Sequence, residues 1–333
     1  MKKYWVIALG LWACVAAQAA LASGFEQLKK LPPEVVARFV KLGGAPDANG
    51  LVGSNHRLGW TGVSLQRGAM LPLIVGAVRN DERLVAESWR AIDAAFAHQQ
   101  ADGSFELKPS EPGQELKPWY YTSDSAFWLC ELSHGLLVLR ESPLGAKFKE
   151  RIAGLMPKIR LAAKRLADGR EDLERHADGK SPNRLCIDAN AFSLTGLLLG
   201  DERLKEIGRH FIERALALQR EDGVFIERGG FDSSYQAVAL LKLEVRSMYF
   251  PDAKVSNAIE RGMKCELARI KPTGEVEVAD NTRTGLGQEK FLGHEKGVNY
   301  GEVAQALLYH GVRCNKKDVI AIGERVLNFR YPK

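Results

Sequence analysis

The sequence predicts an all-α fold, an α/α toroid of five or six helical hairpins with few or no strands. Two observations lead to this prediction: wholly apolar helical segments alternate with amphipathic ones, and one helix-and-turn unit recurs along the chain. Alternation with a period of two residues, which would indicate strands, is confined to short stretches such as residues 276–278. The 333 residues are 45% hydrophobic and 26% charged, which excludes disordered and collagen-like chains.

Residues 1–22 are expected to form a secretory signal peptide. Lys2 and Lys3 precede an apolar run over residues 4–17, and small residues follow it. The run is shorter than the roughly 20 residues that a membrane span needs. Cleavage leaves one domain, residues 23–333, with no membrane segment, and the loss of two lysines lowers the net charge from +6 to +4. We therefore expect a periplasmic or secreted protein.

A repeat at an offset of 120 residues is the strongest organisational signal. Residues 81–105 and 201–225 are identical at 11 of 25 positions. Each copy predicts an amphipathic helix that ends in a Gln-x-x-Asp-Gly-x-Phe turn, where the glycine supplies a positive φ. A degenerate third copy covers residues 255–276.

Ahead of each amphipathic helix lies a segment that is apolar nearly all round. A helix of this kind must be enclosed, whereas a striped helix covers it. After a first helix at 33–42, the expected pairs are 69–78 with the helix from 81, 126–139 with 148–166, 191–199 with the helix from 201, 235–245 with 255–270, and 303–312 with 317–327. Short connections make each pair an antiparallel hairpin. Stacked hairpins could form an open solenoid, but an inner layer that is apolar on all sides favours a closed ring.

The loops that enter the inner helices carry most of the polar and aromatic residues, and parallel inner helices would gather these loops on one rim. Arginine, lysine, asparagine, histidine, tyrosine and tryptophan together suit an anionic, hydroxyl-rich ligand on which aromatic rings can stack, such as an acidic polysaccharide. The candidate substrate-binding residues are His56, Arg57, Trp60, Trp119, Tyr120, Tyr121, Asp124, Glu227, Asp232, Gln236 and Lys296.

Structural roles remain open for several of these candidates. Asp124 and Asp232 could cap helix N-termini, and Gln236 fits a capping box with Ser233. The aromatic run at 119–121 could pack in the core. Nucleic acid is excluded as a partner because the mature charge excess is small and export removes the usual partner.

Two features of the chain resemble known families. The Gln-x-x-Asp-Gly-x-Phe turns resemble the QW-type turns of α/α-toroid enzymes, although the Asp-x-Asp-Asp cluster of terpene cyclases is missing. The segment 222–235 is similar to segments of toroid polysaccharide lyases of the alginate lyase and heparinase type. This resemblance implies β-elimination on a uronic-acid polymer.

The resemblance also implies roles for individual residues. Arginine and asparagine would neutralise the substrate carboxylate, which makes the proton at C5 acidic, and Asn183, Arg184 and Arg283 are the candidates. Tyr235 would be base or acid, with His294 or Tyr300 as its partner, and its phenolate would need nearby cations such as Arg283, Arg184 or Lys296.

Two rival functions remain open. A glycoside hydrolase needs two carboxylates beside the scissile bond, and Asp124, Glu227 and Asp232 are available. A glycan-binding protein without catalysis would keep only the groove. No cofactor is expected, although a divalent cation stays open, and no CxxC or HExxH spacing supports a zinc site. Of the cysteines, Cys265 and Cys314 could pair. We expect a monomer.

Overall fold

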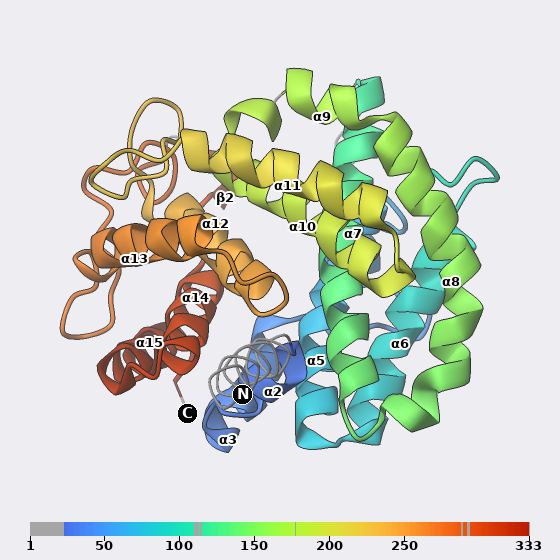
Figure 1. Cartoon of the computed structure of the whole chain (residues 1–333), viewed down its shortest axis with the longest axis horizontal. Coiled ribbons are helices and arrows are strands. Elements are labelled where there is room, and N and C mark those ends of the chain that lie inside the picture. The colour runs from blue at the N-terminus through green and yellow to red at the C-terminus, as the bar shows by residue number, and fades with distance from the viewer. Residues whose placement is uncertain are drawn as a thin grey trace, which may run out of the picture.

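The computed structural model describes residues 23–109, 113, 115–176, 178–287, 289–291 and 294–332. Within these residues the chain forms an α/α toroid, which confirms the predicted fold (Figure 1). The expected signal peptide lies outside the described residues. Among the helices that are described, none is long and apolar enough to span a bilayer.

Five helical hairpins make up the toroid. They are α5 (Met70–Arg79) with α6 (Glu82–Ala97), α7 (Pro118–Glu141) with α8 (Gly145–Asp168), α10 (Pro182–Leu199) with α11 (Glu202–Ala217), α12 (Ser233–Ser247) with α13 (Ala253–Leu267), and α14 (Tyr300–Arg313) with α15 (Lys317–Arg330). The inner helices α5, α7, α10, α12 and α14 contact one another in that order. The outer helices lie at the periphery, with α8 at the right edge of Figure 1 and α15 at its lower left.

A short helix that the sequence analysis did not predict closes the ring. Helix α2 (Gly24–Leu28) contacts α14 on one side and α5 and α7 on the other, so it fills the gap between the last and the first inner helix. The expected first helix is divided into α3 (Pro33–Arg38) and η1 (Phe39–Leu42). The remaining short elements are α4 (Ser54–Leu58), η2 (Val63–Ala69), α9 (Arg170–Arg175), η3 (Asp178–Lys180), β1 (Lys290–Phe291) and β2 (His294–Glu295).

The two kinds of helix differ in burial as the pattern predicts. Almost every residue of α10 and α12 is buried. Helix α13 instead buries one stripe, Val255, Ala258, Ile259, Gly262, Met263 and Glu266, at the spacing of an amphipathic helix. Burial of this stripe against the inner layer holds the outer helix in place.

The glycines of the repeated turn allow neighbouring hairpins to approach closely. Gly103, Gly223 and Gly274 have φ values of +90°, +95° and +90°. A Cβ at any of these positions would lie 2.3 to 2.4 Å from a carbonyl oxygen of the next outer helix. These carbonyls belong to Leu161 of α8, Arg261 of α13 and Arg325 of α15. Only glycine satisfies both the positive φ and this contact.

The other repeated residues fasten the same turn. The amides of Gln99 and Gln219 donate to the carbonyls of Lys158 in α8 and Ala258 in α13, at 2.9 and 2.8 Å. The phenylalanine that ends each turn is 2% exposed in both copies. The repeat therefore joins one hairpin to the next, and its role is in the fold rather than in the site.

The four cysteines of the described chain are free thiols. Cys130 and Cys186 are buried, as expected. The pairing considered for Cys265 and Cys314 is not formed, because the Cys314 sulfur lies against Glu260 and His310 instead.

Candidate functional site

Hydrogen bonds between successive entry loops bring these loops together on one rim, as the sequence analysis predicts. The loop before α7 reaches the loop before α5 through Lys108, whose backbone N–H donates to the carbonyl of Thr61 at 2.7 Å. The Ser181 hydroxyl, before α10, donates to Glu227, before α12, at 2.9 Å. Arg283, before α14, binds the same carboxylate. Residues far apart in sequence are thus fixed at one end of the ring.

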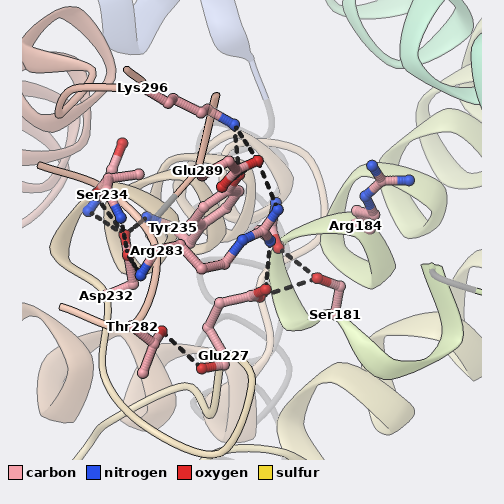
Figure 2. A network of polar contacts seen from close by, with 12 residues as sticks. Ser181, Arg184, Glu227, Asp232, Ser234, Tyr235, Thr282, Arg283, Glu289 and Lys296 are labelled. Carbon is pink, nitrogen blue, oxygen red and sulfur yellow. Dashed lines mark hydrogen bonds and ion pairs between the residues drawn. The ribbon is translucent and has the colours of Figure 1, made fainter. Parts of the chain in front are cut away.

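Tyr235 lies at the centre of a polar cluster on this rim (Figure 2). Its hydroxyl, in the first turn of α12, donates to the carboxylate of Glu289 at 3.0 and 3.1 Å. The ammonium group of Lys296 donates to the Tyr235 oxygen. The guanidinium carbon of Arg283 lies 4.1 Å from the centre of the Tyr235 ring. The structure therefore brings together three residues that the sequence analysis selected, and adds Glu289, which it did not.

Arg283 connects two carboxylates across the rim. One of its terminal nitrogens lies 2.5 Å from Glu227 and the other 2.8 Å from Glu289. The side chains of Arg283 and Glu227 are only 10% and 5% exposed, so this pair is shielded from solvent. Glu227 also accepts from Ser181, and it serves to hold Arg283 rather than to face a ligand.

The surroundings of Tyr235 favour its protonated form, so of the two predicted roles, base or acid, they suit the acid. Burial raises the pKa of Tyr235; Arg283 opposes this rise, and the Glu289 carboxylate adds to it. Cations that could favour a phenolate are present, but burial, together with the Glu289 carboxylate, outweighs their effect on the pKa of Tyr235. Tyr235 is thus a protonated phenol that can act as an acid. The pKa of Glu289 is lowered. Burial alone would raise this pKa, but Arg283 and Lys296 stabilise the charged carboxylate and outweigh burial.

Asp232 and Gln236 have structural roles instead of the expected contacts with substrate. Asp232 is fully buried and accepts from the backbone N–H groups of Ser234 and Tyr235, which caps α12, and also from those of Arg283 and Thr284. It holds the Arg283 loop against the helix that carries Tyr235. The amide of Gln236, 1% exposed, bonds to the backbone of residues 223, 225 and 262.

The aromatic residues of the rim divide between packing and exposure. Trp60 is 7% exposed, stacks on His98 at 3.8 Å and donates its indole N–H to the carbonyl of Glu106, so it is a packing residue. Trp119 and Tyr120, at the start of α7, have ring centres 3.9 Å apart and are half-buried, as is Tyr121. His56 and Arg57 are exposed on α4.

The two expected partners of Tyr235 lie elsewhere. The Tyr300 ring stacks on Phe329 of α15 with ring centres 5.3 Å apart, and its hydroxyl accepts from the backbone N–H of Val276 at 3.3 Å. His294 is exposed on β2, opposite residue 291 of β1. Among the described contacts of the Tyr235 hydroxyl, Glu289 takes the place expected for either residue.

A cavity of about 260 Å³ opens on the rim, lined by residues of the loops before α5 and α7 and by the start of α7 and α10. Its lining includes Tyr120, Asp124, Phe127 and the cations Arg67, Lys108 and Arg184. The guanidinium carbons of Arg67 and Arg184 lie 5.1 and 5.7 Å from the centre of the Phe127 ring. Three cations on one cavity favour an anionic ligand.

Two of these cations, Arg67 and Lys108, were missed by the sequence analysis. Arg67 lies in η2, directly before the inner helix α5. Its position as a basic residue at the entry of an inner helix is a signal that could have identified it.

Two residues of the cavity, Asp124 and Arg184, are bound by other residues of the chain. The partners of Asp124 are backbone N–H groups, and the partner of Arg184 is a carboxylate. Asp124, in the second turn of α7, accepts from the backbone N–H groups of Val63 and Ser64 at 2.8 and 3.2 Å, so it caps the distant η2 rather than its own helix. Burial raises the pKa of Asp124. Arg184 pairs with Asp178 at 2.5 Å.

Asn183, next to Arg184, is 5% exposed and accepts from Ser181 at 3.2 Å. Asn183 is therefore buried and, unlike Arg184, does not line the cavity.

Comparison with known proteins identifies the fold. No protein-family model matches the sequence, and no curated protein shows significant similarity to it. A polysaccharide lyase matches 80% of the chain with a TM-score of 0.52 and 11% identity, and the match spans only 38% of that lyase. The unsaturated glucuronyl hydrolase from Bacillus sp. GL1, described as responsible for the degradation of glycosaminoglycan, matches 92% of the chain and 84% of its own length with a TM-score of 0.50 and 11% identity.

A variant of UGL, described with the saccharide dGlcA-Glc-Rha-Glc, matches 89% of the chain and 81% of its own length. Its TM-score is again 0.50 at 11% identity. At this level of identity the similarities show a shared α/α-toroid architecture.

Proposed function

We propose that the chain is an exported enzyme that degrades a uronic-acid-containing polysaccharide by β-elimination. The observation that carries this proposal is the geometry around Glu289. The Tyr235 hydroxyl and the side chains of Arg283 and Lys296 all bind this one carboxylate. They form a preorganised carboxylate site on the rim (Figure 2). Arg184, on the adjacent helix α10, lines the cationic cavity.

In this proposal the cations hold the substrate by its carboxylates. A uronate bound by Arg184 and Arg67 has its charge neutralised, which stabilises the negative charge that develops when the C5 proton leaves. A neighbouring uronate of the polymer can compete for Lys296, which is 37% exposed. This competition raises the basicity of Glu289, because Lys296 is one of the groups that lower its pKa.

The proton transfers then balance within one pair of residues. Glu289 takes the proton from C5, the electrons form the C4–C5 double bond, and the bond from C4 to the glycosidic oxygen breaks. Tyr235, protonated because burial raises its pKa, donates its proton to the leaving oxygen. The protonated Glu289 returns a proton to Tyr235 through the hydrogen bond that joins them, which restores the starting state.

A second function, glycoside hydrolysis, is favoured by two observations. Asp124 lines the cavity, and its raised pKa suits a general acid. The unsaturated glucuronyl hydrolase is also similar to the chain over 84% of its own length, whereas the match spans only 38% of the lyase. Glu227 and Asp232, the other carboxylates considered, are occupied by Arg283 and by backbone N–H groups.

A substrate screen tests the proposal. The purified chain is incubated with alginate, polyglucuronate, pectate and glycosaminoglycans, and separately with unsaturated oligouronides. β-Elimination predicts new ultraviolet absorbance from a conjugated double bond in the polymer reactions. New reducing ends without this absorbance, or loss of absorbance from the unsaturated oligouronides, would instead support hydrolysis. Binding without either signal would support the non-catalytic glycan-binding function.

Export is part of the proposal and has its own test. Expression of the full chain in a Gram-negative host, followed by N-terminal sequencing of the periplasmic and secreted protein, should give a mature start at Ser23. Recovery of the uncleaved chain from the cytoplasm alone would contradict export.

A further inference from the structure

A second cluster of chemically reactive side chains lies at the end of α14 that is away from the rim. It consists of Glu260 from α13 and of His310 and Cys314 from the last turn of α14 and its cap. One ligand atom from each residue lies within 4.8 Å of the other two. The Glu260 oxygen Oε1 is 3.6 Å from the Cys314 sulfur and 3.6 Å from Nε2 of His310.

The two separations from Glu260 fit the coordination of a single metal ion. The Cys314 sulfur lies 3.8 Å from Nδ1 of the same imidazole, so it binds a metal held on Nε2 after its side chain turns toward Glu260. Bonds of about 2.0 to 2.3 Å at tetrahedral angles place neighbouring ligand atoms roughly 3.3 to 3.8 Å apart. A set of one imidazole nitrogen, one thiolate sulfur and one carboxylate oxygen is typical of zinc among the divalent metals.

The histidine is already oriented for coordination. Its side chain is 1% exposed, and its Nδ1 lies 2.8 Å from Oε1 of Glu244. Glu244 is fully buried and is itself held by Arg313 at 2.5 and 3.1 Å. A carboxylate on one imidazole nitrogen fixes the ring and leaves the other nitrogen available, which is the usual arrangement behind a metal-binding histidine. In His310 that other nitrogen, Nε2, faces Glu260.

A positive charge already occupies the cluster. The ammonium group of Lys316 lies 2.6 Å from Oε2 of Glu260 and 3.2 Å from Nε2 of His310. The Lys316 side chain is 39% exposed, so it can turn into solvent without leaving a buried charge. The cluster is thus complementary to a cation, and the lysine is a displaceable occupant.

We propose that Glu260, His310 and Cys314 bind one zinc ion, with water completing the coordination and Lys316 displaced. The ion joins α13 to the end of α14 and so fastens the last two hairpins. The ligands come from two helices, with the histidine and cysteine four residues apart, so no short sequence motif reveals the site. It is separate from the Tyr235 cluster and does not depend on the proposed function.

Zinc binding to the full chain tests this proposal directly. The protein is stripped with a chelator, dialysed and titrated with zinc chloride, and bound zinc is measured by elemental analysis together with the melting temperature. We expect one zinc per chain, a higher melting temperature with zinc than with chelator, and slower reaction of Cys314 with a thiol reagent. Substoichiometric zinc with no change in melting temperature would overturn the proposal.

Variants separate a metal site from a simple charge network. Cys314→Ser and Glu260→Gln should each weaken zinc binding by about tenfold or more, whereas Cys265→Ser, which changes a cysteine of α13 outside the cluster, should bind like the native chain. Lys316→Ala should bind zinc more tightly, because the competing ammonium group is gone. Zinc binding that is unchanged in Cys314→Ser and Glu260→Gln, or weakened in Lys316→Ala, would contradict the assignment.

Discussion

Replacement of Arg283 by methionine tests how the rim is held together. The guanidinium of Arg283 binds Glu227 at 2.5 Å in a pair that is about nine-tenths buried. Its removal leaves the Glu227 carboxylate buried with only the Ser181 hydroxyl as a described side-chain donor. Loss of one member of a buried ion pair costs about 3 to 5 kcal/mol in the free energy of unfolding. Solvent screening reduces this cost only slightly, because both side chains are shielded from solvent.

The expected cost converts into a measurable shift in the melting temperature. An unfolding entropy of about 2.1 cal/mol/K per residue gives about 0.65 kcal/mol/K for roughly 310 residues, so the melting temperature should fall by about 5 to 8 °C. Circular dichroism melts and urea titrations measure the two quantities.

Two further variants complete this test. The double variant Arg283→Met with Glu227→Gln removes the stranded charge and should recover most of the loss. Arg83→Met, in an exposed pair with Glu87, should stay within about 0.5 kcal/mol of the native chain. A loss below about 1 kcal/mol in Arg283→Met, or no recovery in the double variant, would refute the reasoning.

Three further predictions address the fold, its pH dependence and the chemistry. Gly223→Ala should destabilise the chain by more than about 1 kcal/mol, because its φ is +95° and the new Cβ would meet a carbonyl oxygen at 2.3 Å, whereas Gly154→Ala, in an open helical position, should be neutral or stabilising in the same urea titration. Burial lowers the pKa of His134 from 6.5 to about 4. Between these values the unfolded chain binds the extra proton, so the free energy of unfolding should fall by up to about 3 kcal/mol as pH drops through this window. His134→Gln should flatten that dependence, and an equally steep profile in the variant would contradict the assignment. Asp124→Asn should retain cleavage within about tenfold if Tyr235 is the acid, and a loss of about 100-fold or more would favour hydrolysis.

The architecture could be predicted because the buried face of a helix appears in the sequence as a regular spacing of apolar residues. The stripe on α13 and the apolar surface of α10 are visible as spacings along the chain. The role of the glycine in the repeated turn could also be predicted, because a positive φ is a local property of the turn. Helix α2 was missed because its five residues directly follow the expected signal peptide and show no periodicity of their own.

The site could be predicted only in part, because its electrostatics depend on contacts between distant segments. Tyr235, Arg283 and Lys296 were selected by residue type and by their position in entry loops. Glu289 was missed, and with it the direction of the pKa shift of Tyr235, because only the folded loop places this carboxylate on the hydroxyl. Gln236 matched a capping box in sequence, yet its amide bonds to the repeated turn instead.

The mass of the products from a defined oligouronide tests the central claim most directly. β-Elimination through Tyr235 predicts two fragments whose masses sum to that of the substrate, one of them unsaturated. It also predicts that Tyr235→Phe slows their formation by about 100-fold or more, while Tyr300→Phe, which loses a contact with Val276 outside the cluster, leaves the rate nearly unchanged. Fragments whose masses sum to the substrate plus one water, or full activity in Tyr235→Phe, would contradict the account.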